Sequence, residues 1–129
     1  MDYLFLLGRL LLGGFFLNSA YGHFKNVGMM TGYAQSKGIP MPREAVIGTG
    51  IMLLLGGLGI ILGVWIQVSV LLLTVFLLVT SFTMHEYWKD TDQMQKMSNR
   101  INFFKNMALL GSLLMILMIP MPWVWALMK

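Results

Sequence analysis

The chain has 129 residues, of which 57% are hydrophobic and only 11% are charged, and its mean hydropathy is +0.74. A soluble domain of this size does not tolerate such a composition, so the sequence indicates a membrane protein. The absence of cysteine excludes disulfides, thiolate metal sites and a cysteine nucleophile. The net charge of +4 comes from scattered Lys and Arg residues, which argues against a nucleic-acid partner.

Four stretches are apolar over the length of about 20 residues that a membrane-spanning helix needs. They cover residues 3–24, 45–65, 66–84 and 101–123. The sequence therefore predicts an all-α membrane protein, a four-transmembrane-helix antiparallel bundle that forms a single domain over residues 1–129. The first stretch lacks the basic start and the cleavage site of a signal peptide, so we expect it to be retained. The second and third stretches are nearly fused and must form a hairpin.

The first long connection contains signals for a short interfacial helix. Residues 26–37 can form that helix, which Gly38 would end in a left-handed conformation and Pro40 would prevent from continuing. Pro42 then suits the first turn of the second span.

The second long connection contains a helix start. Thr91 or Asp92 can cap a helix that runs unbroken into the fourth span and ends before Pro120 and Pro122. The tail 123–129 is rich in Trp and ends in Lys, so we expect an aromatic and cationic anchor at the opposite membrane surface.

The distribution of basic residues predicts an orientation. Four spans place both long connections on one side, and that side has most of the positive charge, whereas the other side has only Lys129, with Arg9 inside the first span. By the positive-inside rule the long connections are cytoplasmic and the termini are outside. The basic residues on the connection side are Lys25, Lys37, Arg43, Lys89, Lys96, Arg100 and Lys105.

Polar residues of the first span form two stripes at 100° per residue. Polar groups inside a bilayer are costly, so these stripes indicate that more than one face of the helix avoids lipid. One stripe contains Arg9, Gly13, Phe16, Ala20 and His23, and the other, nearly opposite, contains Asn18, Gly22 and Lys25.

The third span has a polar stripe formed by Gln67, Thr74, Ser81 and His85. One interpretation is a channel or a ligand-facing strip that ends in His85, whose imidazole exchanges protons near neutral pH. The other interpretation is hydrogen bonding between packed helices, which is the commoner role of Ser, Thr and Gln in membranes. The second interpretation is favoured for the hydroxyls, and both stay open for His85.

The fourth span presents Asn102, Lys105, Asn106 and Ser112 on one stripe. Lys105 could pair with Glu86, bind an anionic headgroup or an oxygen-rich ligand, or extend to the membrane surface.

The block from His85 to Trp88 places an imidazole, a carboxylate and two aromatic rings at one interface, where aromatic residues commonly lie. As a metal site it is weak, because His85 and Glu86 point about 100° apart and His23 would have to be the third ligand. The Met residues are interpreted as packing residues, and no metal site is predicted.

Small residues indicate that the second span is central to the packing. Thr49, Gly56 and Gly63 repeat every seven residues, and Gly59 with Gly63 forms a GxxxG pair that lets helix backbones approach closely.

A series of motifs resembles the DoxX family of small bacterial membrane proteins. Each motif is weak alone, but their order and spacing match over nearly the whole chain. They are Arg9-Leu10-Leu11-Leu12-Gly13, Gly22 with Lys25, Gly38-Ile39-Pro40-Met41-Pro42, Gly56-Gly57 with Gly63, His85 with Trp88, and Lys105-Asn106 through Gly111.

The resemblance implies a four-helix membrane bundle in the bacterial inner membrane. It also implies a redox association, because the family takes its name from a small subunit of a thiosulfate- and quinone-linked oxidoreductase. Many members have an acidic residue in the second span before the paired glycines. This chain has Met52-Leu53-Leu54-Leu55 there, so an acid-dependent mechanism does not carry over.

Two functional hypotheses follow. In the first, the chain is a subunit of a quinone-linked or redox-associated complex, and its bundle binds a quinone-like lipophile near the cytoplasmic face. In the second, it is a non-enzymatic protein that binds or passes a small lipophile or acts as a docking subunit. The expected partners are membrane lipid and a redox protein, and a homo-oligomer stays open, as does the question of catalysis. The candidate ligand-binding residues are His85, Lys105, Asn106, Arg9, His23, Lys25, Trp88 and Ser81.

Overall fold

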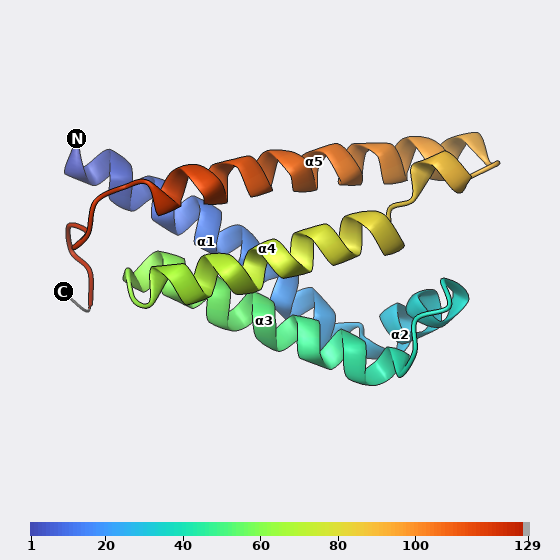
Figure 1. Ribbon diagram of the computed structural model, residues 1–129. Helices are drawn as coiled ribbons and strands as arrows, with labels where there is room; N and C mark the ends of the chain where they lie inside the picture. Colours follow the sequence, from blue (N-terminus) through green and yellow to red (C-terminus); the bar gives the residue numbers. More distant parts are fainter. Residues whose placement is uncertain (128–129) are drawn as a thin grey trace.

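The computed structural model describes residues 1–127, and every regular element in that part of the chain is helical (Figure 1). Four segments are long and apolar enough to cross a membrane: α1, α3, α5 and the segment Ile66–Lys89 that contains α4. The predicted helical membrane protein is therefore confirmed. The elements are α1 Asp2–Lys25, α2 Val27–Ser36, α3 Pro42–Leu62, α4 Ile66–Thr83, the 3-10 turn η1 Tyr87–Lys89, and α5 Gln93–Leu117.

Most helix ends have the residues that the sequence indicated. Gly38, with φ of 76°, follows the short helix α2, and Pro42 is the first residue of α3. Gly63, with φ of 71°, ends α3 in the left-handed region that a side chain disfavours. At the start of α5, the Asp92 carboxylate accepts a hydrogen bond of 3.0 Å from the Gln95 backbone N–H.

Two helices differ in their bounds from the apolar stretches identified in the sequence. The second helix starts and ends three residues earlier than predicted, because Pro42 begins it and Gly63 ends it. The fourth helix ends at Leu117, before Pro120 and Pro122 as predicted, so the apolar stretch 101–123 is helical only as far as residue 117. With 25 residues, α5 is about 38 Å long, so its first turns extend beyond a bilayer core of about 30 Å.

The position of His85 also differs from the prediction. The helix α4 ends at Thr83, so His85 lies in the connection to η1, and helical periodicity does not relate it to Ser81 and Thr74. Its surroundings are set by that connection instead.

The helix α3 is the centre of the packing, as its small residues predicted. It contacts α1, α2 and α4, whereas α5 packs against α4 and η1. The described parts of α1 and α5 do not pack closely against each other. The spans are thus packed in the order α1, α3, α4, α5 (Figure 1). Lys105 of α5 lies near the Phe15 ring of α1, and Arg9 of α1 binds the C-terminal tail that follows α5.

Close contacts at glycines explain why α3 approaches two neighbours. A Cβ atom at Gly13 of α1 would lie 2.8 Å from the Gly57 carbonyl oxygen of α3. A Cβ atom at Gly56 would lie 2.5 Å from the Leu73 side chain of α4. In a membrane, where helices gain little by hiding apolar surface from lipid, such close packing holds them together.

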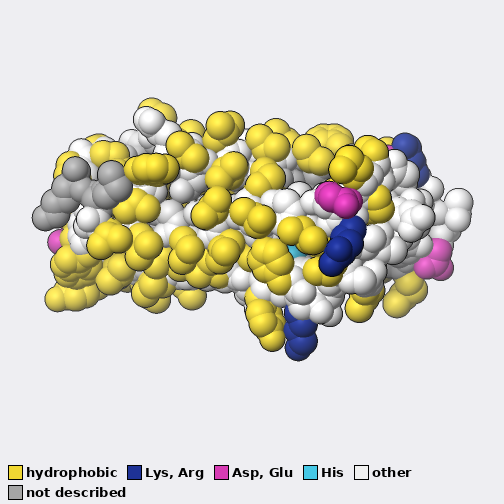
Figure 2. Space-filling view, turned by 90° about the horizontal axis from the view of Figure 1, so that it is seen from below, with side chains coloured by type: hydrophobic (Ala, Val, Ile, Leu, Met, Phe, Trp, Pro, Cys, Tyr) yellow, Lys and Arg dark blue, Asp and Glu magenta, His cyan; other side chains and the backbone are white. Residues whose placement is uncertain are grey.

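The first polar stripe predicted for α1 is its buried face. The five buried residues of this helix are Arg9, Gly13, Phe16, Ala20 and His23, which are the members of that stripe. The opposite stripe lies outside the core, since Asn18 and Lys25 are exposed. On the face that Figure 2 shows, hydrophobic side chains cover the middle and the end that contains the termini, whereas the Lys and Arg side chains lie towards the α2 end.

Arg9 fastens the C-terminal tail to the end of α3. Its guanidinium group donates hydrogen bonds to the carbonyl oxygens of Ile60 and Ile61 at the end of α3, and to those of Val124 and Trp125 in the tail. The group is 3% exposed, and it lies near the rings of Phe5 and Trp123. The last carbonyls of α3 have no partner within the helix, so Arg9 supplies donors that the bilayer cannot.

The prediction for the tail was wrong for Trp123. Its side chain is only 2% exposed and packs edge-on against Phe5, with ring centroids 5.1 Å apart. Arg9 draws the tail backbone inward and thereby brings this ring into the core, while Trp125 stays half-exposed beside Tyr3. Lys129, the cationic part of the predicted anchor, lies outside the described residues.

The packing at Gly13 gives a matched test. Gly13→Ala should lower the free energy of unfolding by about 1–3 kcal/mol, because the Gly57 backbone opposite cannot move aside without a shift of α3. Gly14→Ala should leave stability unchanged or slightly raised, because nothing lies within 4 Å of the new methyl group. Thermal unfolding of both variants in the same nanodiscs measures the difference. Equal midpoints would contradict the close approach of α1 and α3.

Removal of the Arg9 side chain should release the tail. Arg9→Leu leaves the carbonyl groups of Ile61 and Val124 without their donors, and each unsatisfied group costs about 1–3 kcal/mol. We expect a lower unfolding midpoint and faster digestion of the tail by carboxypeptidase. Lys25→Leu is the control, because that exposed cation of the same helix lies over the Tyr21 ring at the opposite end from the tail. A tail as resistant in Arg9→Leu as in the control would overturn this role.

Candidate functional site

A cavity of about 500 Å³ opens at the end of the bundle opposite the termini. All five α-helices contribute to its lining, and most of the lining is apolar, including Met29 and Met30 of α2, Val46 of α3 and Phe76 of α4. The polar residues that line it are Ser19, His23, Tyr33, Thr49, Thr80, Thr83, His85, Lys105 and Asn106. Its volume lies within the roughly 300–1,000 Å³ range of small-molecule sites.

His23 is presented to this cavity by the last turn of α1. Its Nδ1 lies 2.9 Å from the carbonyl oxygen of Ser19, one turn earlier in the same helix. Its ring packs edge-on against Phe76 of α4, with centroids 5.7 Å apart. These two contacts fix the ring on the buried face of α1.

His85 reaches the cavity from the connection between α4 and η1. Its Nδ1 lies 3.2 Å from Oδ1 of Asn99, which is buried on α5. The Asn99 amide donates in turn to the Asp90 carboxylate over 2.8 Å. Nearby, the Tyr33 hydroxyl of α2 donates to the Met84 carbonyl oxygen over 2.9 Å. The position of His85 therefore depends on α2 and α5 as well as on the residues before it.

Asp90, Asn99 and Tyr33 were not among the predicted site residues. Asn99 precedes Asn102 by three residues and Asn106 by seven, so an extension of the α5 stripe by one turn would have included it. Asp90 lies in the loop before α5, and Tyr33 lies on the separate short helix α2. Helical periodicity therefore relates neither residue to the predicted stripes.

Lys105 and Asn106 reach the cavity from α5. The Asn106 amide donates to the Ser81 hydroxyl of α4 over 3.1 Å, and both side chains are buried. Lys105 Nζ donates to Asn102 Oδ1 over 3.3 Å and lies 5.4 Å from the centre of the Phe15 ring of α1. Lys105 does not pair with Glu86 as one alternative proposed, because Glu86 pairs with Lys89 at 2.7 Å.

The structure thus brings together four of the eight candidate residues, His23, His85, Lys105 and Asn106. Ser81 does not line the cavity, but its hydroxyl accepts the hydrogen bond from Asn106. This contact agrees with a packing role for the Ser81 hydroxyl.

The other three candidates lie elsewhere. Arg9 is at the opposite end of the bundle, bound to backbone carbonyls, and Lys25 is exposed over the Tyr21 ring. Trp88 belongs to an aromatic cluster with Phe82 and Phe103 and does not line the cavity. The third-span stripe is also divided, because Gln67 lies near the termini.

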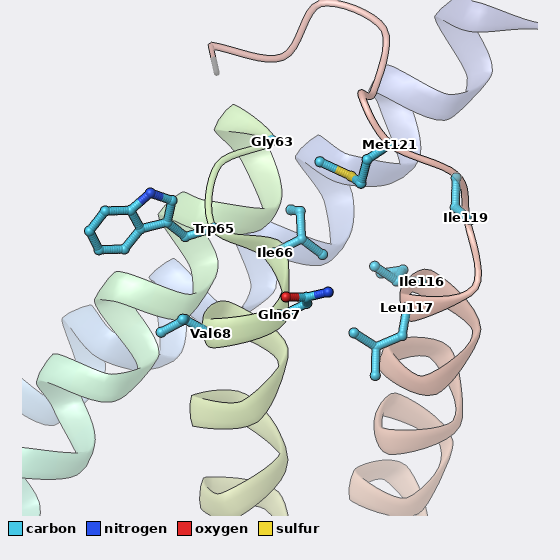
Figure 3. A pocket seen from close by; sticks show the side chains of 9 residues that line it. All are labelled: Gly63, Trp65, Ile66, Gln67, Val68, Ile116, Leu117, Ile119 and Met121. Atoms are coloured by element: carbon cyan, nitrogen blue, oxygen red, sulfur yellow. The ribbon is translucent and has the colours of Figure 1, made fainter. Parts of the chain in front are cut away.

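A second cavity, of about 400 Å³, lies near the termini between the hairpin turn and the end of α5 (Figure 3). Gln67 of α4 extends toward Leu117 of α5 across it, and the rest of the lining is mainly apolar. It contains none of the candidate residues and no ionisable side chain, so it offers less chemistry than the first cavity. No group of three or more His, Asp or Glu residues within residues 1–127 is placed to hold a metal ion.

Comparison with protein families agrees with the fold. The DoxX family model matches residues 4–86, which include α1 to α4 together with His23 and His85, and which make up well over half of the chain. The match does not extend to α5, so Lys105 and Asn106 lie outside it. Comparison with curated proteins and with solved structures finds no match. With four apolar helices in series and a family match across the first three spans, the chain belongs to the DoxX family of membrane proteins.

Proposed function

We propose that this protein binds a quinone-like lipophile in the cavity of about 500 Å³, as a membrane subunit of a quinone-linked or redox-associated complex. The observation that carries the proposal is the meeting of two imidazoles, an ammonium group and an amide in a cavity whose remaining lining is mostly apolar. Clefts with apolar walls and a few convergent polar groups are the usual form of small-molecule sites.

The polar groups suit a head with oxygen atoms. Lys105 donates one hydrogen bond within residues 1–127, so its ammonium group has donors left for a ligand oxygen. His23 and His85 can exchange protons with a head whose protonation changes on reduction. The apolar lining from α2 and Phe76 would hold the ring and the first part of a tail.

A lipophile also needs a route from the bilayer. The helices α1 and α5 do not pack closely against each other, and the Lys105 to Phe15 contact lies between them. Lys105 also lines the cavity. The contact between Lys105 and Phe15 therefore lies at the side of the cavity that faces the space between α1 and α5. We propose that a tail enters along this side while the head remains at the polar end.

Electrons would have to come from a partner or from the ligand itself. The chain has no cysteine and only two histidines, and no dinucleotide-binding fingerprint occurs in its sequence. A role beside a redox protein in the bacterial plasma membrane is consistent with this. Binding or passage of a lipophile without redox chemistry is the alternative, and it uses the same cavity.

The first test is identification of bound lipophiles. The protein is purified in mild detergent, extracted with organic solvent, and the extract is analysed by mass spectrometry. We expect a quinone at a near-stoichiometric level in the native protein and a loss of about tenfold or more in His85→Ala and in Lys105→Ala, because each removes a polar contact to the head.

Two variants serve as controls. Lys25→Ala removes a cation and Trp88→Ala an aromatic ring outside the cavity, so both should keep the native level of quinone. Unchanged quinone in both His85→Ala and Lys105→Ala would contradict the site. A different lipophile would favour the alternative, and none at all would favour a docking role.

The orientation is tested by single cysteines, since the native sequence has none. By the positive-inside rule, Ser98→Cys at the exposed start of α5 should react with a membrane-impermeant maleimide only from the cytoplasm. Asp2→Cys at the other end should react only from outside. Labelling of intact cells compared with inverted vesicles measures both, and the reversed pattern would refute the orientation.

A further inference from the structure

Both histidines of the cavity use Nδ1 within the protein. His23 Nδ1 lies 2.9 Å from the Ser19 carbonyl oxygen, and a carbonyl oxygen can only accept a hydrogen bond. The proton of the neutral His23 ring therefore resides on Nδ1, and Nε2 has a lone pair.

The tautomer of His85 is fixed through two further residues. The Asp90 carboxylate can only accept, so it must face the amide nitrogen of Asn99, at 2.8 Å. The amide oxygen of Asn99 then faces His85 Nδ1 at 3.2 Å, and Nδ1 must donate to it. Asp90 and Asn99 are thus positioning residues, and neutral His85 also has its lone pair on Nε2.

These Nε2 atoms have no hydrogen-bond partner in the described part of the chain. Neither atom is fully enclosed by the described protein, and both residues line the cavity. The cavity therefore offers imidazole acceptors together with the spare donors of Lys105. A matching head must donate as well as accept.

We propose, on the basis of the function proposed above, that the cavity prefers the reduced, dihydroxy form of a quinone-like lipophile to the oxidised form. A hydroxyl of the hydroquinone can donate to an imidazole Nε2 and accept from Lys105. A quinone has only acceptor oxygens, so it would leave the imidazole lone pairs dehydrated and unpaired. Sites built to bond a hydroxyl discriminate strongly against analogues that lack one.

The test compares three probes in nanodiscs that contain the full chain: decylubiquinol, decylubiquinone, and the dimethyl ether of decylubiquinol. Titration under anaerobic conditions, corrected for partition into empty nanodiscs, gives the three affinities. We expect the hydroquinone to bind about tenfold or more tightly than either other probe, because only the hydroquinone has hydroxyl donors.

Matched variants show which atom provides the preference. His85→Asn keeps an amide near the position of Nδ1 but removes the group at Nε2, so the preference for the hydroquinone should fall to about threefold or less. His85→Gln places an amide oxygen near the position of Nε2 and should keep part of it. Asn99→Leu should weaken the preference for the hydroquinone, and nitrogen NMR of this variant should show both neutral tautomers of His85. If Asn99 served only to pack α5, its loss would not change the His85 tautomer.

The outcomes separate this inference from the proposed function. Equal or tighter binding of the quinone, or an unchanged preference in His85→Asn, would overturn the inference while the cavity remains a lipophile site. No binding of any of the three probes above the empty nanodiscs would overturn the proposed function itself.

Discussion

The lack of water around the helices is the constraint on which this structure depends. Inside a bilayer each polar group must find a partner within the protein or within a guest, because lipid tails offer none. Arg9 and the polar residues at the α2 end respond to this constraint in different ways. Near the termini, the polar groups of Arg9 and the α3 carbonyls satisfy one another, whereas at the α2 end His23, His85 and Lys105 keep capacity for hydrogen bonds.

The contrast between Arg9 and Lys105 shows why charge alone does not identify a site. Both are cations on membrane-spanning helices, and both lie near aromatic rings. Arg9 donates four of its five N–H groups to carbonyl oxygens of two separate segments, is almost fully buried and lines neither cavity, so it is not open to a ligand. Lys105 donates to a single amide and faces a cavity. Unused hydrogen-bonding capacity beside empty space, rather than charge, distinguishes the candidate site.

Much of the fold could be predicted because it depends on local rules. Helical periodicity identified the buried face of α1 from Arg9 to His23, and the special conformations of Gly and Pro placed the ends at Gly38, Pro42 and Gly63. Contacts between distant segments could not be predicted in this way. Trp123 seemed to be a surface anchor because only the folded chain brings Arg9 to the tail. His85 seemed to continue a helical stripe, whereas its position is set by Asn99, Asp90 and the end of α4.

The helices α3 and α4 pack closely near the hairpin but not at the α2 end, and this difference explains the position of the cavity. Near the hairpin, Gly56 and Gly59 of α3 let Leu73 and Ser69 of α4 come close enough to leave no room for a side chain. Towards the α2 end, side chains of both helices line the cavity, namely Val46 and Thr49 of α3 and Phe76 and Thr80 of α4. From the hairpin towards the α2 end, α3 and α4 diverge (Figure 1). The helix α5 does not close the space, because it packs on α4 rather than on α1. The short helix α2 then covers that end, with Tyr33 bound to the Met84 carbonyl. The small residues that hold one end together thus leave the ligand space at the other end, beside the two histidines.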